Sequence, residues 1–338
     1  MKKIAVVKII VFSCLALVLC FVLGFAIKGT TVNSLASSYG SYRYADSDLY
    51  EQLNLNEEKV FDTKEISSIK VYWVGGNINI HNSATENISF SENIHETDVE
   101  DKYLIHYAVI KKVLLIRFSS STWNIDKDIR EAKDLDIYLP NKKFSTIHIE
   151  TVSANIFYDG EDRENLYSLS LKSVDGNIDL YNTNIKSLKV DESKGNVYMS
   201  KVIASSISIN EISGSVKGKD IVVDKMTMNF ASSSIDLKGS IKKYITDGLS
   251  GSSKVKFENV PEEITGKFNS TTVVIEIPNN EGFTATLTST TGIIKTEFEG
   301  TFTKDNKLFK TIHTFKYLNE TNKYNFESVS SNILIEMK

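Results

Sequence analysis

Residues 169–243 divide into four segments that align at an offset of nineteen residues. They read LSLKSVDGNIDLYNTNIKS (169–187), LKVDESKGNVYMSKVIASS (188–206), ISINEISGSVKGKDIVVDK (207–225) and MTMNFASSSIDLKGSIKK (226–243). The last segment is one residue shorter than the others. Self-similarity at a period of this size is typical of a chain that stacks one small structural unit on the next. We therefore expect a repeat architecture.

Within each segment, apolar residues alternate with polar ones in two short runs, as at Leu169 and Leu171 and again at Ile178 and Leu180. This alternation predicts two strands per repeat, each with one buried face. Identical strand positions pair best if each coil lies on the previous one, about 4.8 Å away, with parallel strands. The predicted fold is an all-β parallel β-solenoid with coils of about nineteen residues.

A short turn separates the two strands of each repeat, and small residues recur in it. The pairs are Gly176 and Asn177, Gly195 and Asn196, Gly214 and Ser215, and Ser233 and Ser234. Glycine adopts positive φ without penalty, which suits a tight corner. Stacking of the coils places these residues in rows, where Asn and Ser side chains can hydrogen-bond from coil to coil. We interpret them as structural turn columns.

Looser copies of the turn extend the pattern on both sides, so the solenoid domain is expected over residues 65–338, with its clearest repeats at 169–243. Two wide gaps, near 81–146 and 294–323, contain alternating runs of their own. These segments are interpreted as hairpin or cap insertions, because the terminal units of a stacked array must cover exposed edges. Residues 29–64 are rich in Ser, Tyr and Asp and are expected to form a stalk or linker, with a short amphipathic helix possible at its end.

Residues 1–28 have the pattern of a membrane anchor. An uncharged apolar run extends from Ile9 to Ile27, with Lys2, Lys3 and Lys8 before it and Lys28 after it. Nineteen residues of helix approach the thickness of the bilayer core. The positive-inside rule then predicts a cytoplasmic tip, one transmembrane helix and an extracytoplasmic carboxyl-terminal domain at the cell membrane. A cleaved leader is the alternative, because Ser34-Leu35-Ala36 resembles a cleavage site.

Cysteine content indicates how the exported part is stabilised, and its net charge indicates which partners it can bind. Both cysteines, Cys14 and Cys20, lie in the apolar run, so the exported part has no disulfide to stabilise it. Residues 29–338 carry 35 basic and 43 acidic side chains, a net charge of −8. A surface of that sign repels polyanions, so no nucleic-acid partner is expected.

The corners Asp175-Gly176-Asn177-Ile178, Lys194-Gly195-Asn196-Val197 and Ser213-Gly214-Ser215-Val216 resemble those of the putative-adhesin family of bacterial β-solenoid domains, a domain of unknown function. The resemblance covers most of residues 65–338. It implies an exported or membrane-anchored protein, sometimes linked to Gram-positive cell-envelope stress systems. It supplies no catalytic residue, and therefore bears on fold and location more than on function.

A search for chemistry finds isolated candidates. Asp134 and Asp136 share one strand face, whereas Asp175, Asp179 and Asp191 fall on successive coils without forming a column of carboxylates. The five histidines show no spacing typical of a metal site, and no calcium-binding nonapeptide repeat is present. We therefore expect no catalytic site, no cofactor and no metal.

Aromatic residues give the remaining indication of binding. The side chains of Tyr72, Trp73, Trp123, Tyr158 and Tyr198 could project outward and stack on sugars, although packing across strands is the commoner role. The favoured hypothesis is a non-enzymatic, adhesin-like binding or scaffold module whose partner is a cell-wall glycan or an envelope protein. Two alternatives are an accessory partner of an envelope-stress signalling system and a polysaccharide-active β-helix enzyme.

Overall fold

The computed structural model describes residues 50–55, 57–95, 99–120, 127–161, 166–279, 282–318 and 321–338. Leu49–Lys338 form one compact unit that consists almost entirely of strands. The transmembrane segment expected at 9–27 lies outside the described residues. Among the residues that are described, no helix has the length and apolar character needed to cross a membrane.

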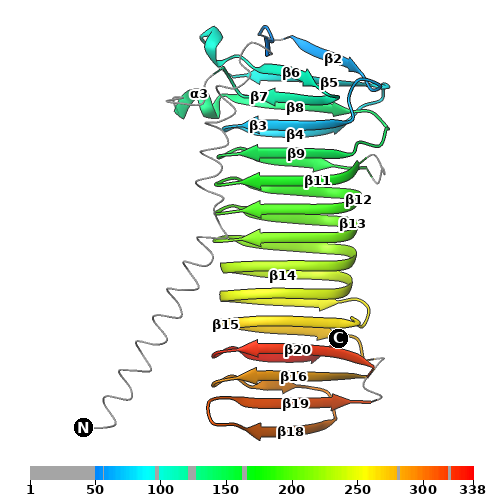
Figure 1. Cartoon of the computed structure of the whole chain (residues 1–338), viewed down its shortest axis with the longest axis vertical. Coiled ribbons are helices and arrows are strands. Elements are labelled where there is room, and N and C mark those ends of the chain that lie inside the picture. The colour runs from blue at the N-terminus through cyan, green and yellow to red at the C-terminus, as the bar shows by residue number, and fades with distance from the viewer. Residues whose placement is uncertain are drawn as a thin grey trace, which may run out of the picture. The chain divides into compact units, whose positions relative to one another are not determined.

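The centre of the unit is a regular stack of coils (Figure 1). Its strands are β11 (Leu166–Ser173), β12 (Ile178–Glu192), β13 (Asn196–Glu211), β14 (Ser215–Phe257) and β15 (Glu263–Ile277). Neighbouring coils pair in parallel at the offset seen in the sequence, so that Leu169 faces Leu188, which faces Ile207, which faces Met226. All four side chains are buried. The fold is thus β-solenoid-like, and its apolar residues form continuous columns along the interior.

Each coil contributes to two sheets that face each other across this interior. We call the strands that precede the glycine corner, such as Leu188–Glu192, the pre-corner sheet, and the strands that follow it, such as Ile178–Tyr181, the post-corner sheet. A second corner joins the sheets at the other side of the coil. Asn182, Lys201 and Asp220 occupy it at φ of 44°, 54° and 55°. Here the left-handed conformation is adopted by non-glycine residues that the sequence analysis did not identify.

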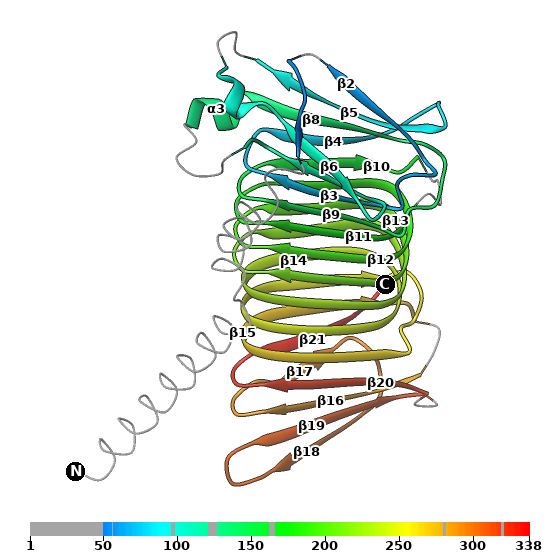
Figure 2. The same cartoon turned by 45° about the horizontal axis from the view of Figure 1, so that its top comes forward.

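The coil order at the N-terminal end departs from the chain order (Figure 2). The strands here are β3 (Ser68–Trp73), β4 (Asn77–Asn82), β7 (Val113–Arg117), β8 (Lys133–Leu139), β9 (Thr146–Thr151) and β10 (Asn155–Asp159). The β3–β4 coil lies between the β9–β10 coil and a later coil formed by β7 and β8. The inserted chain therefore extends the stack outward.

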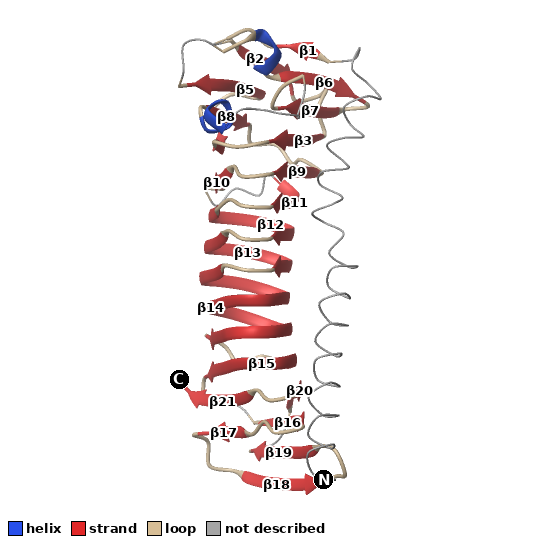
Figure 3. Cartoon of the chain, turned by 90° about the vertical axis from the view of Figure 1, so that its left-hand side faces the viewer, coloured by secondary structure: helices blue, strands red, loops and turns tan. Residues whose placement is uncertain are grey.

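Antiparallel strands complete this end. They are β1 (Glu51–Gln52), β2 (Glu58–Asp62), β5 (Asn87–Ile94) and β6 (His106–Ile110). β5 pairs with β8 and β2 with β5, while β6 pairs with β7 and β1 with β6. The short helices η2 (Asp101–Tyr103) and α3 (Lys127–Glu131) lie in the same region (Figure 3).

Residues 51–62, which the sequence placed in the stalk, are therefore part of the folded unit. They form β1 and β2 and not the amphipathic helix considered for them. The inward-facing side chain of Phe61 contacts the rings of Phe90 and Tyr107, at centroid distances of 6.1 and 5.9 Å. The strand forms because it pairs with an edge that would otherwise be open.

The C-terminal end shows a second departure from chain order. Its strands are β16 (Phe283–Ser289), β17 (Ile294–Thr296), β18 (Thr301–Asn306), β19 (Thr311–Tyr317), β20 (Asn322–Ser328) and β21 (Asn332–Met337). The last coil, β20–β21, lies between β15 and the earlier coil β16–β17. β19 and β18 then add to β16 as an antiparallel hairpin.

The two ends bury their side chains very differently. At the N-terminal end, the Lys133 ammonium lies 2.7 Å from the Glu92 carboxylate, with both side chains fully buried. Burial lowers the pKa of Lys133 to about 8, against the attraction of Glu92, which raises it. At the C-terminal end, Leu308 and Phe309 are 87% and 83% exposed. The N-terminal end is a closed, packed cap, whereas the hairpin tip at the other end remains in solvent.

Candidate functional site: the corner rows and the outer face of the post-corner sheet

Gly176, Gly195 and Gly214 lie directly above one another at the corner. A Cβ on Gly195 would lie 1.7 Å from the carbonyl oxygen of Gly176, and a Cβ on Gly214 would lie 1.9 Å from that of Gly195. None of the three adopts positive φ, so the reason given for them in the sequence analysis is wrong. Glycine is needed because the backbone of the previous coil occupies the space of a side chain. Ser233 continues the row, and its carbonyl oxygen approaches Gly251 in the same way.

The residue after each of these positions points outward and forms a hydrogen-bonded row. The Asn196 amide donates to Asn177 Oδ1 at 2.9 Å, and the Ser215 hydroxyl donates to Asn196 Oδ1 at 2.6 Å. Further along the stack, the hydroxyls of Ser234 and Ser252 are 3.2 Å apart. The corner residues identified from the sequence therefore meet in space, and we call this row the amide row.

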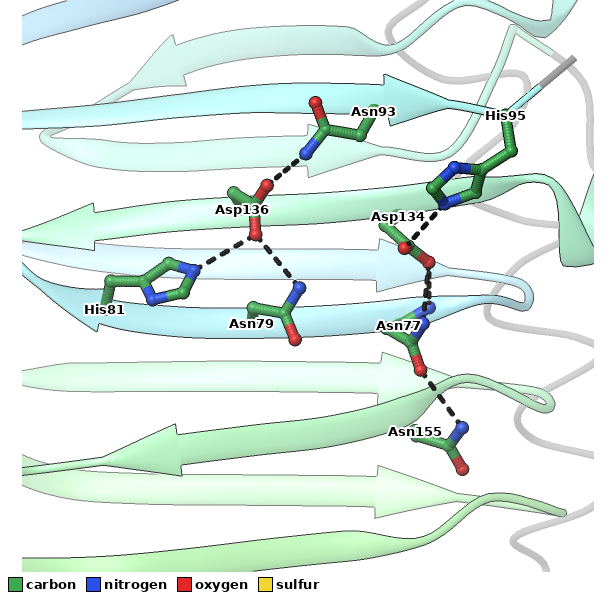
Figure 4. A network of polar contacts seen from close by, with 8 residues as sticks. All are labelled: Asn77, Asn79, His81, Asn93, His95, Asp134, Asp136 and Asn155. Atoms are coloured by element: carbon green, nitrogen blue, oxygen red, sulfur yellow. Dashed lines mark hydrogen bonds and ion pairs between the residues drawn. The ribbon is translucent and has the colours of Figure 1, made fainter.

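The amide row continues toward the N-terminal end, beyond the clear repeats (Figure 4). Asn177 donates to Asn155, Asn155 to Asn77, and Asn77 to Asp134 Oδ1, at 3.3, 3.1 and 2.9 Å. All the amides thus donate in one direction, and the row ends on a carboxylate. A shorter row on the pre-corner sheet repeats this order, with Asn229 donating to Asn210 and Asn210 to Asp191 at 2.8 and 2.5 Å.

Asp134 and Asp136, the paired carboxylates considered for catalysis, are held in this network (Figure 4). Asp136 accepts hydrogen bonds from Asn79 at 2.9 Å and from Asn93, and it contacts His81 Nε2 at 3.1 Å. His95 Nε2 lies 2.9 Å from Asp134. Both carboxylates therefore have protein partners and act as acceptors that connect β8 to β4 and β5.

A polar hollow adjoins this network between β2, β5 and β8, with a volume of about 520 Å³. Its lining is made mostly of hydroxyl and amide side chains, from Ser83, Thr85, Asn87, Ser89, Ser91, Asn93 and Tyr138, with Glu58, Val60 and Glu92. Within the described part of the chain, no cluster of three or more His, Cys, Asp or Glu side chains could hold a metal ion.

The structure separates the other candidate carboxylates. Asp175 is exposed at the corner, and Asp191 lies on the pre-corner sheet, where Lys189 contacts it at 2.5 Å. Asp179 lies on the outer face of the post-corner sheet, between Phe157 on one neighbouring coil and Tyr198 on the other.

The aromatic residues fall into two groups. Tyr72, Trp73 and Tyr158 are buried, with exposures of 7%, 0% and 1%, so the idea that they project outward is wrong. Trp123 lies outside the described residues. Tyr198 is half-buried on the outer face, with Tyr181 and Phe157 beside it: the Phe157–Tyr181 and Tyr181–Tyr198 centroid distances are both 5.5 Å. The sequence analysis missed Phe157 and Tyr181, although both alternate with inward-facing residues.

A second feature that the sequence analysis missed lies inside the corner. Glu192 and Glu211 face each other on adjacent coils, and each is only 2% exposed. Glu192 Oε1 accepts hydrogen bonds from the backbone N–H groups of Ser193, Lys194 and Gly195, whereas Glu192 Oε2 and Glu211 Oε2 are buried without a donor. Burial, and then the neighbouring Glu192, raise the pKa of Glu211 to about 8. The pair therefore carries a proton at neutral pH.

Comparison with known proteins places these features in a family. The family model of Toastrack DUF4097 matches residues 66–335. The crystal structure of a putative adhesin from Bacteroides fragilis NCTC 9343 aligns with 83% of this chain and 96% of its own, at 11% identity and a TM-score of 0.44. That of a putative cell adhesion protein from Clostridium sporogenes ATCC 15579 covers 83% and 98%, at 10% identity and a TM-score of 0.20. No curated protein matches the chain.

Proposed function

We propose, from the premise that this chain belongs to the Toastrack DUF4097 family, that it is a non-enzymatic binding module of the cell envelope. In this proposal, residues 9–27 form a single membrane anchor and residues 65–338 present the solenoid outside the cytoplasm. The partner is a cell-wall glycan or an envelope protein that contacts the outer face of the post-corner sheet.

The observation that carries this proposal is the composition of that face. Amides recur from coil to coil at the corner, and beside them three successive coils each contribute one aromatic ring, from Phe157, Tyr181 and Tyr198. Repetition of weak contacts at a fixed spacing is suited to an extended or polymeric partner, because several contacts are made at once and their effects multiply.

Charge divides the face into two parts. Carboxylates gather toward the N-terminal end, at Asp134, Asp136, Asp159 and Asp179, and Lys217 and Lys219 follow on the next coil. Farther along, lysines alternate with carboxylates, and Lys238 pairs with Glu258 while Lys254 and Lys256 pair with Glu276. Such a division selects the orientation of a charged partner more than it adds affinity.

The test compares two exposed aromatic side chains, one on each sheet, in the full chain in detergent micelles. Phe157 is 39% exposed on the post-corner sheet and Tyr167 is 52% exposed on the pre-corner sheet. We expect Phe157→Ser to weaken co-sedimentation with purified cell-wall material and envelope membranes, and Tyr167→Ser to leave it unchanged. Equal binding by both variants and the unmodified chain would contradict the proposed face.

The membrane topology has its own test. A protease-sensitive tag placed after Lys338 should be cleaved when protease is added to intact cells or protoplasts, since the carboxyl-terminal domain is proposed to lie outside. A tag that is cleaved only after lysis would contradict the proposed location.

A further inference from the structure

We propose that Asp179, together with Phe157, Tyr181 and Tyr198, binds a quaternary ammonium group such as that of choline. This inference rests on the proposed function, because it names a ligand class for one part of the outer face. The four residues are called the aromatic-carboxylate site below.

Strand register builds the site. Phe157, Asp179 and Tyr198 are directly opposite one another on β10, β12 and β13, so the short Asp179 side chain stands between two rings. Tyr181, two residues after Asp179 on the same face, lies with its ring centroid 5.5 Å from each of the other two centroids. Three aromatic rings thus surround the base of one carboxylate on the outer surface.

The Asp179 carboxylate lacks a partner within the described part of the chain: no hydrogen-bond donor and no cation contacts it there. It is nevertheless only half exposed, and burial raises the pKa of Asp179 above its ordinary value. Nearby Asp159, by contrast, accepts a hydrogen bond from the Asn182 amide at 2.9 Å. A negative charge that is partly desolvated and has no counter-ion favours a cationic ligand.

The rings favour a cation over the flat face of a sugar. Adjacent rings are inclined by 40° and 52°, so they do not form a common plane on which a sugar ring could lie. The three rings instead flank one carboxylate, and aromatic rings beside a negative charge are the combination that recognises quaternary ammonium groups. The Lys219 ammonium interacts chiefly with the Tyr198 hydroxyl and lies 5.9 Å from the ring centroid, so it does not cover the ring face.

Hydration decides which cation binds. A primary ammonium is compact and strongly hydrated, and it would lose much of that water beside three rings. A quaternary ammonium is weakly hydrated, carries methyl groups that pack on the rings, and interacts with Asp179 through charge alone. Its positive charge offsets the carboxylate without the desolvation cost of an N–H donor.

The experiment titrates the full chain in detergent micelles with choline chloride, using sodium chloride of equal ionic strength as the reference and tyrosine fluorescence as the signal. We expect saturable binding, weakened about tenfold by Asp179→Asn and about two- to fivefold by Tyr198→Ala. Matched controls on the pre-corner sheet, Asp191→Asn and Tyr167→Ala, should bind choline as the unmodified chain does. Melting temperatures identify any variant that is merely unfolded.

Three results would overturn the inference. The first is no saturable change with choline, the second is equal binding by Asp179→Asn, and the third is binding of an N-acetylglucosamine oligosaccharide at this site in place of choline. Failure here is distinguishable from failure of the proposed function. If Phe157→Ser abolishes co-sedimentation with envelope material while choline does not bind, the binding face stands and the quaternary ammonium ligand is rejected.

Discussion

At the glycine corner, two rows of side chains run along the same coils, one outside and one inside. Outside, Asn177 and Asn196 stack in the amide row, and each side chain donates to one neighbour and accepts from the other. Inside, Glu192 and Glu211 stack at the same spacing, and one oxygen of each carboxylate has no donor. The backbone geometry is shared, so the difference lies in the chemistry of the groups.

The comparison shows what a stacked row requires of a polar group. An amide or a hydroxyl carries both a donor and an acceptor, so the row can continue through any number of coils. A carboxylate carries acceptors only, so it fits at the end of a row, where Asp134 and Asp191 are found. Two carboxylates that face each other on adjacent coils inside the stack are not both charged at neutral pH, so one of them holds a proton.

The substitution with the largest expected effect should disrupt both rows at once. Gly195→Ala places a Cβ 1.7 Å from the carbonyl oxygen of Gly176, and the backbone of an adjacent coil cannot move aside easily. We expect a loss of about 3 kcal/mol or more in the free energy of unfolding, measured by urea denaturation.

Gly218→Ala is the matched control for that substitution. The nearest atom to its added Cβ is Leu237 Cδ2 at 2.9 Å, the end of a flexible side chain. We expect a loss of about 1 kcal/mol, within the usual range for overpacking. Equal losses for the two variants would show that contact between coils does not dictate glycine at the corner.

The second prediction concerns the inner row, where the stability contributed by Glu211 should depend on pH. The folded-state pKa of Glu211 is raised from 4.5 to about 8, so the folded protein holds a proton that the unfolded chain releases. This contribution to stability is fully present below pH 4.5 and is lost as pH rises through about 8. Between these limits we expect the free energy of unfolding to fall by at most about 1.4 kcal/mol per pH unit from this group.

Glu211→Gln should remove the part of that dependence that comes from Glu211, because glutamine does not titrate and its amide supplies the missing donor. Glu192, whose pKa is also raised by burial, keeps its own part. Stability at pH 8 should then increase by about 1–3 kcal/mol. The control is Glu276→Gln, since contacts with Lys254 and Lys256 lower the pKa of Glu276 and it stays charged over the same range. An unchanged slope in Glu211→Gln would contradict a proton held by Glu211 in the folded protein.

The substitution with the smallest expected effect tests the outer row of side chains, the amide row. Asn196→Asp replaces the donor to Asn177 with an acceptor, so two oxygens face each other in the middle of the amide row. We expect a loss of about 1 kcal/mol at neutral pH. Asn196→Ser keeps both functions, as Ser215 does on the next coil, and should cost less. If the two variants are equally stable, donor–acceptor continuity does not govern the row.

The central coils could be predicted from the sequence because their period and alternation are regular. The same alternation also indicates which polar and aromatic side chains point into the interior. Glu192 has the same parity as Leu188 and Val190, so its inward direction could have been inferred, and Trp73 shares the parity of Ile69 and Val71. In both cases, residue type was given more weight than strand parity.

The order of the end coils could not be predicted. β7–β8 stack outside β3–β4, and β20–β21 lie between β15 and β16–β17. Every coil presents a similar edge, so the local sequence pattern does not specify which edge pairs with which. The aromatic-carboxylate site depends on contacts between coils in the same way. Phe157 and Tyr181 are not separated by the nineteen-residue period, and only the stacking of β10 on β12 brings them together.

Disulfide cross-linking tests most directly whether residues nineteen apart lie in contact at the corner. In a Cys14→Ser, Cys20→Ser background, the pair Asn177→Cys and Asn196→Cys lies on adjacent coils about 4.8 Å apart, within reach of a disulfide. The control pair Asn177→Cys and Ser215→Cys spans two coils, about 9.6 Å, which is too far. Rapid oxidation of the first pair and not of the second is the predicted result, whereas equal oxidation of both, or of neither, would contradict the stacked corner.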